Sequence, residues 1–164
     1  MSNAKLKKFN NVISAVSIVL LLIALLFGFS ILKIGVQNLV AEDNVHIDIE
    51  SSANTREITE GTITSITATT TEVSYVAEGN DLTAELQVYT DEFSVGDKVD
   101  VYYAINEPKN VNNIRVPELF ISYYHKMGTQ MLKIGLLIVG VCGGIGLVLF
   151  IIALKLRKKI GTAD

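Results

Sequence analysis

Carboxylates are the most numerous side chains in this sequence that could do chemistry. Asp91, Glu92, Asp97 and Asp100 lie close together along the chain, and such a group could surround a cation or supply the acid and base of a hydrolase. The spacing lacks the regular Asp-x-Asp-x-Asp-Gly loop of calcium sites. Solvated loops and strand edges are therefore the expected positions of these acids.

The other reactive residues are few and widely separated. His46 and His125 lie near the two ends of the middle segment, and Cys142 lies within a long apolar run. The sequence contains no His-x-x-x-His, Cys-x-x-Cys, Gly-x-Ser-x-Gly or phosphate-binding glycine motif, so zinc, nucleophilic and nucleotide chemistry have no support. We predict a protein that is not an enzyme, with no catalytic residue, cofactor or metal. A pH sensor built on the two histidines is a minor alternative.

Two uncharged apolar runs frame the middle segment and must position it. Phe9–Leu32 has 24 residues and Ile134–Leu154 has 21, and about 18 are enough to cross a bilayer as a helix. The first run is longer than the apolar part of a signal peptide, which favours an uncleaved anchor over a cleaved signal. The predicted segments are a basic tail over 1–8, a transmembrane helix over 9–34, a linker over 35–45, a β-domain over 46–117, an interfacial connector over 118–132, a transmembrane helix over 133–154 and a basic tail over 155–164.

Charge is divided sharply along the chain. Between positions 36 and 126 there are sixteen acidic and five basic side chains, an excess of eleven negative charges, which disfavours nucleic acid as a partner. Basic residues instead flank the apolar runs, and lysine and arginine remain on the cytoplasmic side of a membrane. The predicted topology signals are Lys5, Lys7, Lys8, Lys155, Arg157, Lys158 and Lys159. They predict a multi-pass protein of the cytoplasmic membrane with both termini inside and the central domain outside. The lack of cysteine in that outer domain favours a bacterial cell envelope.

Several residues beside or within the apolar runs are expected to contact lipid or another helix. The predicted interface anchors are Tyr123, Tyr124, Lys33 and Lys133. Gly140 and Gly144 are four positions apart, where glycine lets two helix backbones approach closely. Their partner is either the first apolar helix or a second copy of the chain, and the sequence leaves both open. Membrane lipid and a homo-oligomer through the second helix are thus among the predicted partners.

The middle segment alternates between polar and apolar residues with a period of two, as half-buried strands do. Strands are predicted at 46–50, 61–66, 73–77, 82–88, 99–103 and 114–116. The turn residues Gly79-Asn80-Asp81 join two of them as a hairpin. About six short strands without a helical period favour a small antiparallel barrel or sandwich. The expected fold class is a membrane α+β protein in which two transmembrane helices flank a small all-β domain.

Three motifs together resemble the domain-of-unknown-function 3592 family. They are Gly61-Thr62-Ile63, the run Gly96-Asp97-Lys98-Val99-Asp100-Val101-Tyr102-Tyr103, and Pro108 in the following loop. Members of this family are bacterial membrane proteins with a small β-domain next to one or two spans, and the resemblance covers about 59–146. It implies the same architecture here. The motifs consist of turn glycines and strand valines, so the resemblance implies a fold and no activity.

These features favour a non-enzymatic module that two helices hold on the membrane and that contacts another membrane or envelope protein. The second hypothesis is a self-associating membrane protein joined through Gly140 and Gly144. The third is an extracytoplasmic ligand sensor or a hydrolase that uses the clustered carboxylates.

Overall fold

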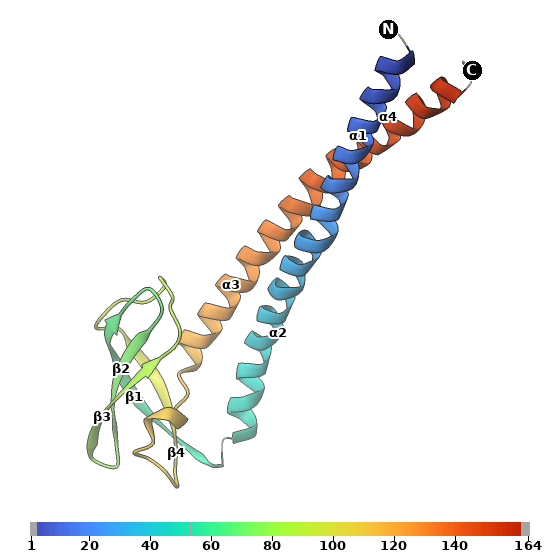
Figure 1. Ribbon diagram of the computed structural model, residues 1–164. Coiled ribbons are helices and arrows are strands. Elements are labelled where there is room, and N and C mark those ends of the chain that lie inside the picture. Colours follow the sequence, from blue (N-terminus) through green and yellow to red (C-terminus); the bar gives the residue numbers. More distant parts are fainter. Residues whose placement is uncertain (1–2, 53, 162–164) are drawn as a thin grey trace. The chain divides into compact units, whose positions relative to one another are not determined.

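The computed structural model describes residues 3–52 and 54–161, and Figure 1 shows their helices and strands. Two long apolar helices flank a four-stranded antiparallel sheet, so the fold is α+β. The chain divides into two compact units. One contains the chain up to Val36 and from Thr129 onward, and the other contains Gln37–Gly128. We call the first unit the helix pair and the second the β-module.

Each long helix contains one turn of π-helix between two α-helical segments. The segments of the first are α1 (Asn3–Ile23), η1 (Ala24–Gly28) and α2 (Phe29–Ser52), and those of the second are α3 (Pro117–Ile138), η3 (Val139–Gly143) and α4 (Gly144–Gly161). By length and composition both helices could cross a membrane. The chain thus has two helices of the kind that a two-span membrane protein needs.

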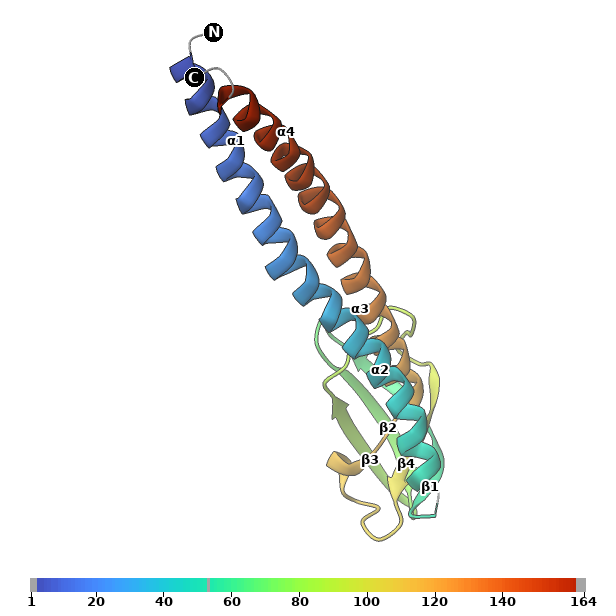
Figure 2. The same ribbon diagram turned by 90° about the vertical axis from the view of Figure 1, so that its right-hand side faces the viewer.

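Small residues bring the two helices of the helix pair together. Gly28 lies against Val139, and Gly143 lies against Ala24, so the two helices run antiparallel with η1 beside η3. Figures 1 and 2 both show α1 next to α4. Ser17 is also fully buried. Close backbone approach at small residues is the usual way in which membrane helices pack, because lipid is as apolar as leucine and gives no hydrophobic drive.

The sheet has the strand order β3-β2-β1-β4 with antiparallel neighbours. Its strands are β1 (Arg56–Ile66), β2 (Thr71–Ala77), β3 (Asn80–Leu86) and β4 (Lys98–Ala104). A two-residue turn, Glu78-Gly79, joins β2 to β3, and both of its residues have a positive φ. This is the geometry of the tight turns that match the twist of a hairpin. The predicted hairpin is therefore confirmed, with its turn one position earlier than expected.

One face of the sheet carries the core of the β-module. Val73, Tyr75 and Ala84 point to this face from β2 and β3, and Val99 and Val101 do so from β4. The covering layer is the chain after the last strand, and its buried members are Ile114, Val116 and Leu119. Gly61 lies in the middle of β1, where an added Cβ would be 2.5 Å from Val101 Cγ2. Glycine is needed there because the side chains of the neighbouring strands cover it closely.

The prediction of a barrel is wrong, because the sheet is open. In the described residues β3 and β4 form its two edges and do not pair with each other. The expected strand at 114–116 is reduced to a single bridge, in which the backbones of Arg115 and Tyr102 exchange two hydrogen bonds of 2.8 Å. Pro117 then begins α3, and proline is well suited to the first turn of a helix. The segment after β4 thus covers the core face of the sheet and does not close the sheet into a barrel.

The prediction of a strand at 46–50 is also wrong. These residues are the last turns of α2, which ends only at Ser52. The side-chain hydroxyls of Ser51 and Ser52 donate hydrogen bonds to the carbonyl of Asp48, at 3.1 and 2.6 Å. The predicted linker over 35–45 is likewise helical. Extending a helix that already exists costs little, because each added residue gains one backbone hydrogen bond.

Candidate functional site

A cleft in the β-module brings apolar and charged side chains together. It has a volume of about 370 Å³ and lies between one face of α2 and the start of α3, with Arg115 just before α3. Its α2 wall has a helical spacing that puts every member on one side, and its opposite wall includes two aromatic rings. The lining residues are Ala41, Asn44, Val45, Asp48, Ile49, Arg115, Pro117, Phe120 and Tyr124. A mostly apolar cleft with a few polar groups is the usual form of a small-molecule site.

One end of the cleft is polar. Arg115 Nε donates to Asp48 Oδ2 at 3.2 Å, and Arg115 Nη1 donates to the carbonyl of Ile114 at 3.0 Å. Arg115 Nη2 has no acceptor among the described residues. Both charged side chains of the pair are about half exposed, so solvent screens the pair and its net contribution to stability is small.

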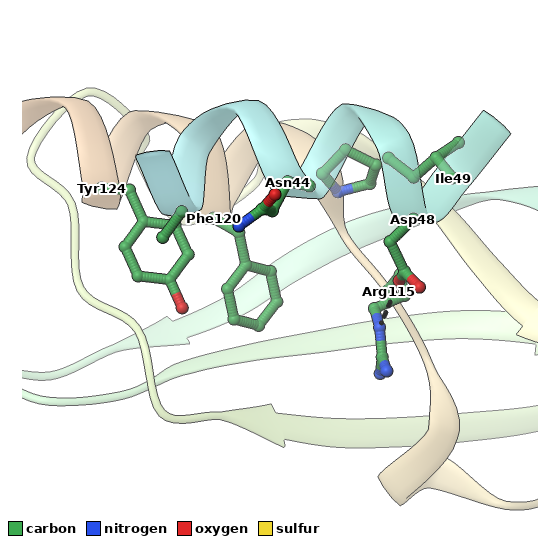
Figure 3. Close-up of a pocket in the computed structure, with 9 residues that line it drawn as sticks. Asn44, Asp48, Ile49, Arg115, Phe120 and Tyr124 are labelled. Atoms are coloured by element: carbon green, nitrogen blue, oxygen red, sulfur yellow. Dashed lines mark hydrogen bonds and ion pairs between the residues drawn. The ribbon is translucent and has the colours of Figure 1, made fainter. Parts of the chain in front are cut away.

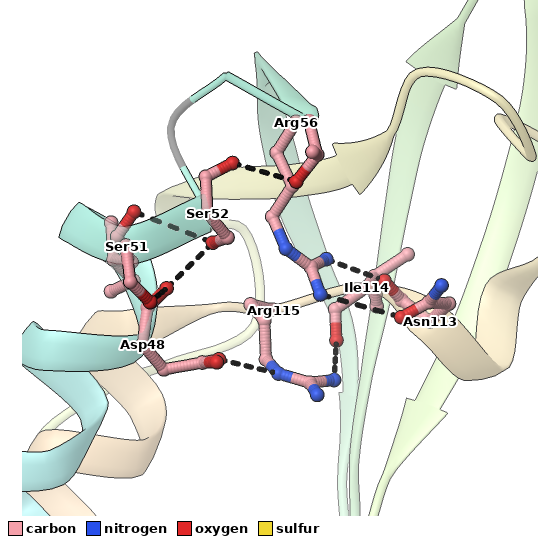
Figure 4. Close-up of polar contacts among 9 residues, drawn as sticks. Asp48, Ser51, Ser52, Arg56, Asn113, Ile114 and Arg115 are labelled. Atoms are coloured by element: carbon pink, nitrogen blue, oxygen red, sulfur yellow. Dashed lines mark hydrogen bonds and ion pairs between the residues drawn. The ribbon is translucent and has the colours of Figure 1, made fainter.

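A second arginine lies beside this pair, as Figure 4 shows. Arg56 donates from Nη1 and Nη2 to the carbonyl and side-chain oxygens of Asn113, at 2.7 and 3.3 Å. Burial lowers the pKa of the Arg56 guanidinium, the charge of Arg115 lowers it further, and Asp48 acts in the opposite direction. Two guanidinium groups therefore lie near the charge of Asp48. Arg115 lines the cleft, whereas Arg56 lines a different cavity.

A second polar contact joins α2 to α3. His125 Nδ1 lies 3.1 Å from Glu42 Oε2, and the histidine ring is mostly exposed while the glutamate is mostly buried. Only a protonated histidine makes this contact an ion pair. The contact contains one of the two histidines proposed above as a pH sensor. The side chain of the other, His46, lies outside the described part of the structure.

The loop after β3 is tied to α3 by polar contacts. Thr90 and Ser122 are buried, and their hydroxyl oxygens lie 2.6 Å apart. Ser122 also donates to Glu92 Oε2 at 2.5 Å, and Lys126 pairs with Asp91. The hydrogen bond from Lys126 lowers the pKa of the Asp91 carboxyl. The predicted carboxylate pair Asp91-Glu92 thus holds the loop on the helix.

We predict a pH-dependent loss of stability at Tyr103. Its hydroxyl donates to Glu57 Oε2 at 2.6 Å, and this bond, with burial and the glutamate charge, raises the pKa of Tyr103 to about 12. The folded state thus favours the protonated phenol, so the bond stabilises fully below the ordinary pKa of about 10 and its contribution disappears as the pH rises through about 12. Urea unfolding followed by the methyl NMR signals of the core should show Tyr103→Phe less stable by about 1 kcal/mol at pH 8.

That difference should shrink between pH 10 and pH 12, because ionisation of Tyr103 breaks the same bond in the wild type. Tyr102→Phe is the matched control, since Tyr102 is the adjacent tyrosine of β4 and the hydroxyl that donates to Glu57 belongs to Tyr103. A gap between wild type and Tyr103→Phe that stays constant up to pH 12 would contradict the assignment.

The clustered carboxylates do not come together. Asp97 closes the turn before β4, where its Oδ2 accepts from the backbone N–H of Ser94 at 2.8 Å. Asp100 instead lines a second cavity of about 370 Å³, with Glu50, Glu118 and Tyr102. In the part of the chain that the structure describes, no three His, Cys, Asp or Glu residues are placed to hold a metal ion. Glu50 and Glu118 are acidic residues that sequence spacing alone did not connect with Asp100.

Gly140 and Gly144 face away from the first helix. A Cβ added at either position would meet nothing within 4 Å, and both line a shallow apolar groove with Val141, Ile145 and Val148. The glycines of the second helix that pack against the first are Gly135, Gly143 and Gly146. Of the two partners that the sequence left open for Gly140 and Gly144, the first helix is therefore excluded.

The predicted anchors and topology signals are found at the following positions. Tyr123 packs partly against the core, and Tyr124 lines the cleft with its ring 5.5 Å from that of Tyr123. Lys33 and Lys133 are exposed. The exposed basic residues of the two ends are Lys5, Lys7, Lys8, Lys155, Arg157, Lys158 and Lys159. Because the helix pair is antiparallel, the two basic clusters lie at the same end of it.

Comparison with known proteins identifies no relative of this chain. No family model matches the chain, and neither a curated protein nor a solved structure is similar to it. The function must therefore be inferred from the chain itself.

Proposed function

We propose that this chain is a two-span protein of the cytoplasmic membrane that presents an acidic β-module outside the cell and binds another membrane or envelope protein without catalysing a reaction. The carrying observation is the contrast between two long apolar helices and a separate unit with an open, acidic sheet. The resemblance to the domain-of-unknown-function 3592 family agrees with this architecture and stays a prediction.

The orientation follows from the basic clusters, which favour the cytoplasmic side. Cysteine labelling tests it in intact cells, with Cys142→Ala as the background. A membrane-impermeant maleimide should label Thr83→Cys, on exposed β3, and should label Lys5→Cys or Lys159→Cys only after the cells are permeabilised. Labelling of the two terminal positions in intact cells, with Thr83→Cys protected, would reverse the proposed topology.

The outer face of β2 and β3, opposite the core, is the proposed contact surface. Its side chains are Glu72, Ser74, Val76, Asp81, Thr83 and Glu85. Val76 is 48% exposed on this face although it is apolar, and β3 is an edge strand whose outer side is unpaired among the described strands. Edge strands are common sites of strand addition by a protein partner. The three charged residues of this set, Glu72, Asp81 and Glu85, are all acidic, which favours a basic partner segment.

Site-specific photo-cross-linking in native membranes tests this surface. A benzophenone side chain at Val76 or Thr83 should give an adduct with a second protein. Val95 is the matched control, because it is also apolar and exposed but lies in the loop before β4. Adducts no stronger at positions 76 and 83 than at 95 would remove the outer face of β2 and β3 as the contact surface.

Two like charges on this face lead to a stability prediction. Glu72 and Glu85 are directly opposite each other on β2 and β3, and such pairs are destabilising. Glu85→Lys should therefore stabilise the β-module by about 0.5–1 kcal/mol in urea unfolding at low ionic strength, while it weakens the adduct at Val76. Glu107→Lys, in a loop, is the charge-matched control. A Glu85→Lys variant that is less stable than wild type would contradict the charge argument.

A second candidate function is self-association through the second helix. It is favoured by the exposed groove at Gly140 and Gly144, which none of the residues that the structure describes fills. Gly144→Leu should then shift an oligomer toward monomer in lipid bilayers, because the added side chain fills the contact. Leu25→Phe, which adds bulk at an exposed position of the first helix, should leave the distribution unchanged. An unaltered oligomer in Gly144→Leu would remove this candidate.

A further inference from the structure

The cleft in the β-module has no role in the proposed function, and its two ends differ in chemistry. Figure 3 shows Tyr124 toward one end of the cleft with the Phe120 ring next to it, and the Asp48–Arg115 contact toward the other end. The ring centroids are 6.3 Å apart. The aromatic end is completed by Ala41 and Val45 of α2. A molecule that fills this volume therefore meets apolar walls at one end and charged groups at the other.

The charges at the polar end favour an anion. Arg115 directs Nε to Asp48 and Nη1 to a backbone carbonyl, which leaves Nη2 without an acceptor in the described residues. Arg56 lies beside Arg115 but outside the lining of the cleft, and it adds a second positive charge to the surroundings of Asp48. An arginine with donors to spare is the preferred partner of a carboxylate, since it combines charge with directed hydrogen bonds. Asp48 fixes the guanidinium and offsets one of the two positive charges.

The size of the cleft favours a small ligand. A volume of about 370 Å³ is at the lower end of the range of small-molecule sites. A phospholipid with two acyl chains would exceed it, whereas one aromatic ring or one short alkyl chain with a head group would fit.

We propose that the cleft binds a small amphipathic carboxylate, with its apolar body against Phe120, Tyr124 and Ala41 and its carboxylate on Arg115. The apolar body gains free energy by leaving water, and the carboxylate gains a charge-assisted hydrogen bond. The inference is independent of the protein partner proposed above, because the cleft is lined by α2, α3 and the segment between β4 and α3, and by no residue of β2 or β3.

The test uses the full chain in lipid nanodiscs, with empty nanodiscs as the blank, and 4-phenylbutyrate as the probe. Its uncharged twin, 4-phenyl-1-butanol, has the same ring and chain. Ligand-detected NMR titration should give saturable binding of the acid to the protein, with an affinity at least about tenfold above that of the alcohol. Equal affinity for acid and alcohol, or no saturable binding of the acid above the blank, would overturn the proposal.

Three variants locate the site. Arg115→Gln should weaken binding of the acid about tenfold or more without changing that of the alcohol, and Arg115→Lys should retain part of the preference. Lys98→Gln is the charge-matched control on the sheet and should bind as the wild type does. Ala41→Phe keeps every charge and fills the aromatic end, so it should abolish binding of both probes. Undiminished binding in Ala41→Phe would overturn the cleft as the site, whatever the effect of Arg115→Gln on folding.

Discussion

Leu119→Ala is expected to destabilise the β-module by about 2–5 kcal/mol. Leu119 is fully buried beneath the sheet, where it belongs to the same core as Val73, Val101 and Val116. Removing its side chain leaves a cavity that the surrounding strands cannot fill without breaking their pairing. A loss of this size is a large fraction of the total stability of a small domain.

Tyrosine fluorescence during urea unfolding measures this effect in the full chain. The protein has no tryptophan, and all six tyrosines lie between positions 75 and 124, so the signal reports on the β-module alone. Ile47→Ala is the matched control, because Ile47 is 61% exposed on α2 and should change stability by less than about 0.5 kcal/mol. Similar losses in the two variants would show that Leu119 does not carry the core.

Gly135→Leu is expected to force the helix pair apart. A Cβ at position 135 would lie 2.7 Å from Leu32 Cγ and 3.0 Å from Leu32 N. The second contact is with backbone, so rotation of the Leu32 side chain cannot relieve it. Inserting extra methylene groups into a packed contact costs about 1–3 kcal/mol. Leucine adds a whole side chain, so we expect a cost in the upper part of this range.

Disulfide formation across the pair detects the displacement. Ala24 Cβ lies 3.6 Å from the Cβ position of residue 143, which suits a disulfide. Ala24→Cys with Gly143→Cys, in a Cys142→Ala background, should therefore oxidise readily. Adding Gly135→Leu should slow oxidation at least about tenfold, since 1.4 kcal/mol corresponds to a factor of ten. Gly144→Leu, with no neighbour within 4 Å, should oxidise at the original rate, and equal slowing by both leucines would contradict the packing described.

The long apolar runs and the four central strands could be predicted from the sequence because each has a strong local period. Both apolar runs are helical, and the residues predicted as strands at 61–66, 73–77 and 99–103 are extended. Leu82 to Leu86 also pair as expected within β3. In each case the local pattern and the tertiary contacts favour the same structure, so the local pattern was sufficient.

The segment 46–50 shows where a local pattern fails. His46-Ile47-Asp48-Ile49-Glu50 alternates in the sequence, yet in α2 Ile49 lines the cleft while Ile47 is exposed. Five residues are too few to distinguish a period of two from a helical period. In a strand Ile47 and Ile49 would share a face, whereas in a helix residues two apart point to different sides. Residues 46–50 are helical because they continue α2, and these five residues alone do not indicate where α2 ends.

The candidate site could be predicted only in fragments. The position of Tyr124 near an apolar run marks it in the sequence, whereas nothing distinguishes Arg115 from the other four basic residues between positions 36 and 126. Nothing in the sequence indicated that Asp48 would meet Arg115, because the two are far apart along the chain and Asp48 was assigned to a strand. The Asp48–Arg115 pair forms because α2 is helical at Asp48 and because the segment after β4 runs next to α2. Both features depend on tertiary contacts that the local sequence does not show.

The strand order β3-β2-β1-β4 has a consequence for biosynthesis. The inner strand β1 leaves the ribosome first, and β2 and β3 can pair with it in sequence, but its other neighbour begins only at Lys98. At a translation rate of about 5–20 residues per second, this neighbour follows on the order of seconds later. During that interval the nascent chain exposes a row of unpaired backbone groups on β1 that a foreign strand could occupy. Safe production of this protein therefore depends on shielding β1 until β4 arrives.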